Sequence, residues 1–160
     1  MTNQVILYDR LANVVKLIDG IKSISLKKAQ QMGFTPAYLM QIACNLLSLD
    51  NDKQSQQALK LVEAALQKCP TSKYDHVGYI ISYDRMSDKV KIFGGAITVP
   101  FKIALHKGIT PEHMIQMAIQ LLSLHDDSKS KVALSSAKEA QEACHIVQET
   151  QPKYKNKRYR

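Results

Sequence analysis

Cysteine and long apolar runs are both scarce in this sequence of 160 residues. The three cysteines are an odd number without CxxC spacing, which excludes a disulfide framework and a zinc ribbon and indicates a reducing compartment. No stretch approaches the roughly 18 apolar residues that cross a bilayer, and the start lacks the basic-then-apolar order of a signal peptide. We therefore expect a cytoplasmic protein without a transmembrane segment.

The sequence also lacks the motifs that usually carry catalysis or cofactor binding. It has no GxSxG, P-loop or GxGxxG pattern, and its five histidines show no HxxxH or HxH spacing. Cys144 and His145 are neighbours in the chain, a placement that suits a nucleophile and its base poorly. These absences predict a protein that is not an enzyme, with no catalytic residue, no cofactor and no metal site.

Acidic residues are outnumbered by basic ones. With 22 Lys and Arg against 14 Asp and Glu, the formal net charge is +8, and such a balance by itself suggests a polyanionic ligand. Along the chain, however, residues 1–75 carry +3, residues 76–145 carry +1 and residues 146–160 carry +4. Half of the excess belongs to the last segment, which weakens the suggestion for the rest of the chain.

The first half of the chain resembles the second half. When the sequence is shifted by 75 residues, 24 of 70 aligned positions are identical without a gap. The matches include Gly33 with Gly108, and the run Leu46-Leu47-Ser48-Leu49 with the run that starts at Leu121. Chance does not produce such agreement, so we predict an internal duplication.

Both copies show the same predicted order of elements. Two apolar strands surround a polar turn, and an extended stretch, a short helix, a very apolar central helix and an amphipathic third helix follow. In the first and second copy the expected elements are residues 5–9 and 79–84, 14–18 and 90–93, 21–25 and 96–100, 26–32 and 101–107, 36–49 and 111–124, and 54–68 and 129–146.

Residues with special backbone preferences mark the helix boundaries. Gly33 and Gly108 follow the short helix, where a left-handed conformation favours glycine. Thr35 and Thr110 are suited to cap the central helix, and a proline follows each of them at the first helical position. The central helix is apolar nearly all round, which predicts that it lies in a core.

We expect an α+β, helix-rich fold in which the two copies share one core. A unit of about 70 residues buries too little surface to be stable alone, and a short polar connector does not allow independent tumbling. The expected division is residues 1–70 as the first repeat, 71–75 as the connector, 76–146 as the second repeat and 147–160 as a basic, disordered tail. The whole would resemble a fused homodimer, with the central helices near a pseudo-two-fold axis.

The longest polar motif that both copies share is a tyrosine-led triplet. A structural role would have the aspartate accept hydrogen bonds at a hairpin turn while the arginine pairs with it or packs its stem. A paired binding site is the alternative. The candidate binding residues are Tyr8, Asp9, Arg10, Tyr83, Asp84 and Arg85.

Residues 25–39 resemble a helix-turn-helix. Ala29, Gly33, Leu39 and Ile42 have the spacing of two helices that cross at a tight turn, and the second copy repeats it. A helix that reads DNA needs basic or base-contacting side chains, yet residues 35–49 contain no Lys or Arg. This favours a plain helical hairpin, whose apolar central helix could also offer a groove for a partner peptide.

The end of the chain interleaves cations with tyrosine. Basic residues release counterions from nucleic acid, and tyrosine can stack on unpaired bases. A solvated tail, a contact with an anionic membrane and a C-terminal secretion address fit the same composition. The candidate contacts to nucleic acid or another anion are Lys153, Tyr154, Lys155, Lys157, Arg158 and Arg160.

Together these features predict a non-enzymatic adaptor or regulatory protein that binds a protein partner through a surface presented twice. The alternative is a nucleic-acid-binding regulator that uses the helix-turn-helix-like segments and the basic tail.

Overall fold

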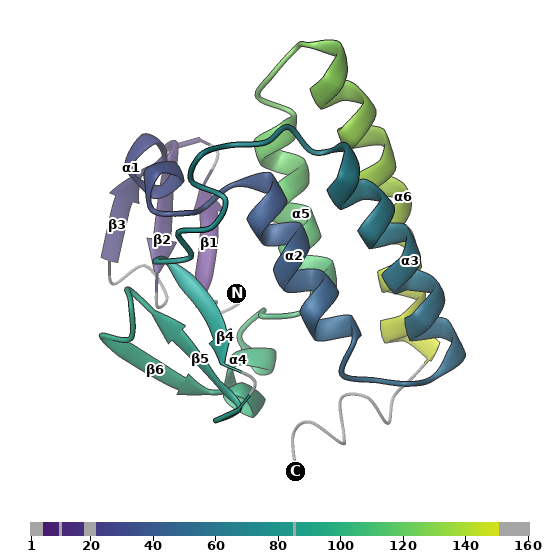
Figure 1. Cartoon of the computed structure of the whole chain (residues 1–160). Coiled ribbons are helices and arrows are strands. Elements are labelled where there is room, and N and C mark those ends of the chain that lie inside the picture. The colour runs from purple at the N-terminus through teal and green to yellow at the C-terminus, as the bar shows by residue number, and fades with distance from the viewer. Residues whose placement is uncertain (1–4, 10, 18–21, 85, 151–160) are drawn as a thin grey trace. The chain divides into compact units, whose positions relative to one another are not determined.

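The computed structural model describes residues 5–9, 11–17, 22–84 and 86–150, with only the backbone described for residues 148–150. These residues form a mixed α+β fold with two three-stranded antiparallel sheets and six helices (Figure 1). The strands are β1 (Ile6–Asp9), β2 (Val14–Leu17), β3 (Lys22–Ser25), β4 (Ile81–Asp84), β5 (Lys89–Ile92) and β6 (Ile97–Pro100). The helices are α1 (Leu26–Gln31), α2 (Pro36–Leu47), α3 (Lys53–Lys68), α4 (Phe101–His106), α5 (Pro111–Leu122) and α6 (Ser128–Thr150).

The fold consists of two compact units, and each is built from both halves of the sequence. The sheet unit contains the described residues of Met1–Phe34 and Lys73–Ile109, which carry both sheets and the two short helices α1 and α4. The helix unit contains those of Thr35–Ser72 and Thr110–Lys157, which carry α2, α3, α5 and α6. The compact units therefore run across the expected repeats, since each repeat supplies half of each unit.

Each sheet is a hairpin extended by a third strand. In the first sheet β1 pairs with β2, placing Ile6 opposite Leu17, and β2 pairs with β3. In the second sheet β4 pairs with β5, placing Ile81 opposite Ile92, and β5 pairs with β6. The predicted hairpins are confirmed, and the extended stretch after them is a strand in both halves.

Alternation along the strands gives each sheet one buried face. Because successive side chains point to opposite faces, Ile6 and Tyr8 are buried while Leu7 between them is exposed. The buried side chains of the sheet unit are Val5, Ile6, Tyr8, Val15, Leu17, Leu26, Ala29 and Phe34 from the first half, and Ile80, Ile81, Val90, Ile92, Phe101, Ala104, Leu105 and Ile109 from the second.

Glycine ends both short helices, as predicted. The φ angle is 102° at Gly33 and 96° at Gly108, a conformation that side chains with a Cβ rarely adopt. After α1 the N–H of Phe34 donates to the carbonyl of Ala29 at 3.0 Å, and after α4 the N–H of Ile109 donates to that of Ala104 at 2.9 Å. These bonds satisfy the last carbonyls of each helix and direct the chain out of it.

Backbone hydrogen bonds at matched positions join the halves of the sheet unit. The N–H of Val5, before β1, donates to the carbonyl of Lys107, after α4, at 2.9 Å. The N–H of Ile80, before β4, donates to the carbonyl of Met32, after α1, at 3.4 Å. The donors Val5 and Ile80 are 75 residues apart in the sequence, and so are the two acceptors, so the start of each sheet is tied to the end of the other half's short helix.

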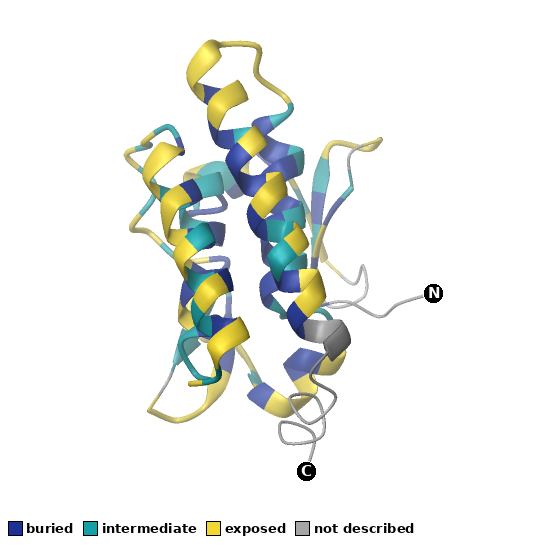
Figure 2. Ribbon diagram, turned by 90° about the vertical axis from the view of Figure 1, so that its right-hand side faces the viewer, coloured by how far each residue is buried: buried dark blue, intermediate teal, exposed yellow. Residues whose placement is uncertain are grey.

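In the helix unit the two apolar helices pack together. α2 lies against α5 and α3, and α6 lies against α5 and α3. The faces of α3 and α6 toward the other helices are buried, and the opposite faces are exposed (Figure 2). Thr35 and Thr110 cap α2 and α5 as predicted, each accepting a backbone N–H at 3.2 Å. The predicted core position of the central helices is confirmed.

Three helices end two or more residues away from the expected position. α2 and α5 end two residues early, at Leu47 and Leu122, because the serine that follows donates its hydroxyl to a carbonyl of the last turn at 2.8 Å. α6 continues to Thr150, past the expected end at residue 146, and Val147 is buried. The first residues assigned to the tail are therefore helical.

Candidate functional site

The turns of the two hairpins are the most distinctive surface feature of the sheet unit. We call residues 9–13 the first tip and residues 84–88 the second tip. In the first tip Tyr8 donates its hydroxyl to Oδ1 of Asn13 at 2.9 Å, and Asp9 accepts the N–H of Ala12 at 3.2 Å. Asp9 also pairs with Lys16 of β2 at 3.0 Å. Asn13 closes the turn with a φ angle of 57°, which asparagine tolerates better than most residues.

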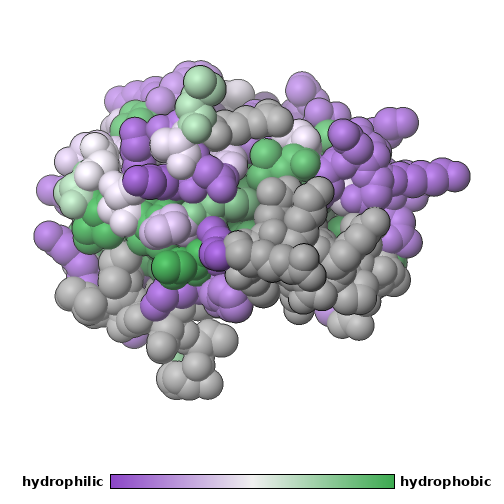
Figure 3. Space-filling model, turned by 90° about the horizontal axis from the view of Figure 1, so that it is seen from below, coloured by the Kyte–Doolittle hydropathy of each residue, from purple (hydrophilic) through white to green (hydrophobic). Residues whose placement is uncertain are grey.

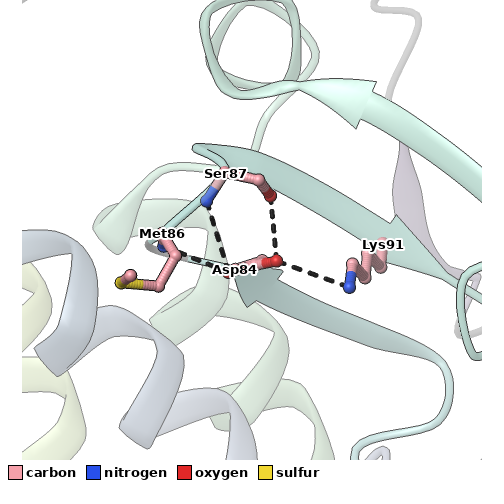
Figure 4. A network of polar contacts seen from close by, with 4 residues as sticks. All are labelled: Asp84, Met86, Ser87 and Lys91. Carbon is pink, nitrogen blue, oxygen red and sulfur yellow. Dashed lines mark hydrogen bonds and ion pairs between the residues drawn. The ribbon is translucent and has the colours of Figure 1, made fainter.

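The second tip repeats these contacts. Tyr83 donates its hydroxyl to Oδ1 of Asp88 at 2.7 Å, and Asp88 also has a φ angle of 57°. Asp84 accepts the hydroxyl of Ser87 at 2.9 Å and the N–H of Met86 at 3.1 Å, and it pairs with Lys91 at 3.4 Å (Figure 4). Both tips are therefore fixed by a tyrosine, an aspartate and a lysine from the adjoining strands.

Asp9 and Asp84 are held in the charged form by their hydrogen-bond partners. The hydrogen bond from Lys16, followed by the N–H of Ala12, lowers the pKa of Asp9 from its ordinary value. The pKa of Asp84 is lowered chiefly by the hydroxyl of Ser87. These carboxylates act as acceptors that hold the turns, so the structure gives the aspartates of the triplets a turn-forming role.

Each tip exposes one large apolar side chain at the same position. Leu11 is 101 % exposed and Met86 is 96 % exposed, whereas no other large apolar side chain among the described residues exceeds 54 %. Turn positions are usually polar or glycine, because solvent surrounds them. Two matched turns that present an apolar side chain to solvent are suited to insertion into a pocket of another molecule.

The triplets contribute to these tips in different ways. Tyr8 is only 2 % exposed, so its ring belongs to the core, and Tyr83 is half-buried against Phe101 with 4.7 Å between the ring centroids. Arg10 and Arg85 lie outside the described residues. The tail candidates Lys153, Tyr154, Lys155, Lys157, Arg158 and Arg160 also lie outside them.

Leu11 and Met86 were not among the residues predicted from the sequence to form a binding site. The signal was present, because an apolar residue stands inside a polar turn at matched positions of both halves. Whether such a residue folds back or stays in solvent depends on the turn geometry, which the pattern alone does not give.

The units of the fold differ in charge. Residues 1–34 and 73–109 of the sheet unit hold 11 Lys and Arg against 5 Asp and Glu, a net charge of +6. Residues 35–72 and 110–150 of the helix unit hold 6 against 9, a net charge of −3. The net charge of each repeat does not reveal this difference, because a sheet-unit segment of +3 is followed in the chain by a helix-unit segment of lower charge, 0 for residues 35–72 and −3 for residues 110–150.

The central helices of the helix unit bury most of their side chains. Seven of the twelve residues of α2 and eight of the twelve of α5 are buried. The neighbouring helices cover most of these apolar side chains, and the expected peptide groove on α2 and α5 stays a prediction. The same burial leaves α2 poorly suited to read DNA.

Other chemical groups of the helix unit form isolated contacts. Nδ1 of His145 lies 3.1 Å from a carboxylate oxygen of Glu112, and burial raises the pKa of the Cys44 and Cys144 thiols to about 12. Among the described residues, no group of three or more His, Cys, Asp or Glu side chains is placed to hold a metal ion. No helix within the described ranges is both long and apolar enough to cross a membrane.

No protein-family model matches the chain, and neither the comparison with curated proteins nor the comparison with solved structures gives a match.

Proposed function

We propose that the chain is an internally duplicated, pseudo-two-fold protein that acts as a non-enzymatic adaptor. The duplication is supported by positions 75 residues apart that make the same contacts, namely the two tips, the two glycine-terminated helices and the two threonine caps. The exchanged bonds of Val5 and Ile80 follow the reciprocal pattern of a two-fold interface.

The two tips are the proposed docking elements for a protein partner. The single observation that carries this proposal is the near-complete exposure of Leu11 and Met86 at matched hairpin turns. Burying such a side chain in a partner's pocket gains about 1.5 to 3 kcal/mol. Figure 1 shows the β1–β2 turn and the β4–β5 turn at opposite ends of the sheet unit, so each tip takes its own partner molecule.

The test compares the proteins captured from the native lysate by three versions of the full chain. These are the wild type, the double variant Leu11→Ser with Met86→Ser, and the control Val132→Ser. Val132 is 54 % exposed on α6 in the other unit, so the control removes a similar exposed apolar group. We expect the wild type and the control to retain a stoichiometric partner that the double variant loses.

Calorimetry with the purified partner then counts the sites. Two partner molecules should bind each wild-type chain, and either single tip variant should reduce the stoichiometry to one. Capture of the same proteins in equal amounts by all three versions would refute docking through the tips.

The charge of the sheet unit favours nucleic-acid binding as a second candidate function. The net charge of +6 on this unit attracts a polyanion, and this charge does not include the basic tail. The test is fluorescence anisotropy with a labelled oligothymidylate of about 12 nucleotides, a length within the usual site sizes for single strands. We expect affinity to fall with salt and to persist in a chain that ends at Thr150.

A further inference from the structure

We propose that Tyr79, Phe93 and Lys22 form a stacking site for an unpaired base of a single-stranded nucleic acid. We call these three residues the stacking platform. The inference rests on the second candidate function and names the place in the sheet unit where a base would bind. It uses neither the tail nor the helix-turn-helix-like segments.

The platform combines two rings with a cation. The ring centroids of Tyr79 and Phe93 lie 6.2 Å apart with an interplanar angle of 57°. Tyr79 is 45 % exposed, and Phe93 is half-buried beside it. Nζ of Lys22, from β3, lies 5.2 Å from the centroid of the Phe93 ring. An exposed aromatic face next to a positive charge is the combination that binds a base and its phosphate together.

The backbone that carries Phe93 has an uncommon conformation. Phe93 has a φ angle of 55°, which is rare for a bulky residue, and Gly94 has one of 63°. The N–H of Phe93 donates to the carbonyl of Ile80 at 3.1 Å, and that of Gly94 to the carbonyl of Tyr79 at 2.9 Å. Strained conformations of this kind persist where the surroundings hold them and are common at ligand sites.

Gly94 also provides the space that Tyr79 occupies. A Cβ at Gly94 would lie 2.6 Å from Cε1 of Tyr79, so the tyrosine ring rests directly on the glycine backbone. The N–H of Tyr79 donates to the carbonyl of Met32 at 3.0 Å, which fixes the base of the side chain. The ring is therefore held in place before a ligand arrives, which lowers the entropy lost on stacking.

Charge and surface chemistry favour a single strand over a duplex. The surface of the sheet unit, at the left of Figure 3, shows apolar side chains between polar and charged ones. Bases of a duplex are already stacked and cannot cover an aromatic ring, whereas unpaired bases can. The net charge of +6 on the unit supplies attraction for the phosphates that flank the stacked base.

The experiment measures binding of the full chain to labelled oligothymidylate, to oligouridylate of the same length and to a duplex of that length. Tyr79→Leu keeps an apolar side chain but removes the ring, and Tyr79→Phe restores the ring without the hydroxyl. We expect Tyr79→Leu to weaken single-strand binding by about 5-fold to 100-fold and Tyr79→Phe to bind like the wild type. Equal thermal unfolding of the variants shows that the fold is unchanged.

The role of Lys22 is tested through the salt dependence of the affinity for a single strand. Lys22→Gln should reduce the slope of log affinity against log salt by about 0.7 for a single strand. Lys60→Gln, an equal charge loss at an exposed position of α3, should leave the slope unchanged.

The outcomes separate the site from the function. Failure of the wild type to bind any oligonucleotide at low salt would overturn both the second candidate function and the platform. Wild-type binding that Tyr79→Leu does not weaken would overturn the platform alone. Equal affinity for the duplex, or displacement by polyglutamate as effectively as by unlabelled oligonucleotide, would also overturn it. Comparison of the two single strands identifies the sugar that the site prefers.

Discussion

Asn13 and Asp88 show how single residues fix the surface that the fold presents. Each closes a hairpin turn in a left-handed conformation and accepts a hydrogen bond from a tyrosine of the preceding strand. The backbone carbonyls of the same two residues accept the N–H groups that begin α1 and α4, at 3.2 Å and 3.0 Å. One residue in each half thus connects the tip, the strand and the short helix.

Gly33 allows two backbones to approach closely, and its substitution tests this contact. A Cβ at Gly33 would lie 2.5 Å from the backbone nitrogen of Gly78, whereas one at Gly95 would meet nothing within 4 Å. The φ angles are similar, 102° and 100°. We expect Gly95→Ala to lose about 1 to 3 kcal/mol of unfolding free energy from backbone strain alone, and Gly33→Ala to lose more because of the added clash.

Urea unfolding followed by circular dichroism measures both variants. The Gly95→Ala variant is the matched control, because it has the same backbone strain without the clash. An equal loss for both would show that the approach of Gly78 does not matter.

At the scale of elements, the long helices of the two halves begin with matched caps, and α2 and α5 end before matched serines. Asp52 accepts the N–H of Ser55 at 2.9 Å before α3, and Asp127 accepts that of Ser130 at 2.9 Å at the start of α6. Aspartate is one of the few residues that suit such cap positions. The sequence pattern misplaced the ends of α2 and α5, because the apolar run continues past the serine that ends the helix.

Packing of the helices protects two thiols, which gives a prediction about their reactivity. The pKa of Cys44 is raised to about 12 by burial and then by Glu63, and that of Cys144 by burial, Glu112 and Cys44. Because only the thiolate reacts, alkylation by iodoacetamide near pH 8 should be on the order of a thousandfold slower than for a free thiol.

Peptide mapping by mass spectrometry after timed alkylation identifies which cysteine has reacted. The same thiols should react rapidly in urea, and the native rate should rise as the pH approaches 12. Labelling of either thiol in the native protein at the unfolded rate would show that the helix unit opens readily.

At the scale of the whole chain, neither unit belongs to one half of the sequence. The chain passes between the units after Phe34, after Ser72 and after Ile109, so each half contributes one segment to each unit. Buried residues of α2 pack against α5, and Val5 bonds to Lys107. Separation of the halves therefore removes partners in both units at once.

This interdependence, together with the proposed duplication, predicts the behaviour of residues 1–72 expressed alone. The half should not fold as a monomer, because a segment of this size with half of each core missing exposes the apolar face of α2. We expect it to be either unfolded or a homodimer in which a second copy takes the place of the missing half.

Light scattering with size-exclusion chromatography and circular dichroism distinguish these states. As a control, refolding residues 1–72 with residues 73–160 should restore the helical signal and cooperative unfolding of the full chain. A cooperatively folded monomer of the first half would contradict the prediction.

The sequence by itself determined the elements of this protein. The turn residues, the glycines after the short helices and the threonine caps act over a few neighbouring residues, so their effects can be inferred locally. Tertiary structure alone decided which elements share a unit, since that depends on contacts between distant segments. It also brought Lys22 over Phe93, left Leu11 and Met86 in solvent and gathered the positive charge in the sheet unit, because each of these depends on where the chain returns in space.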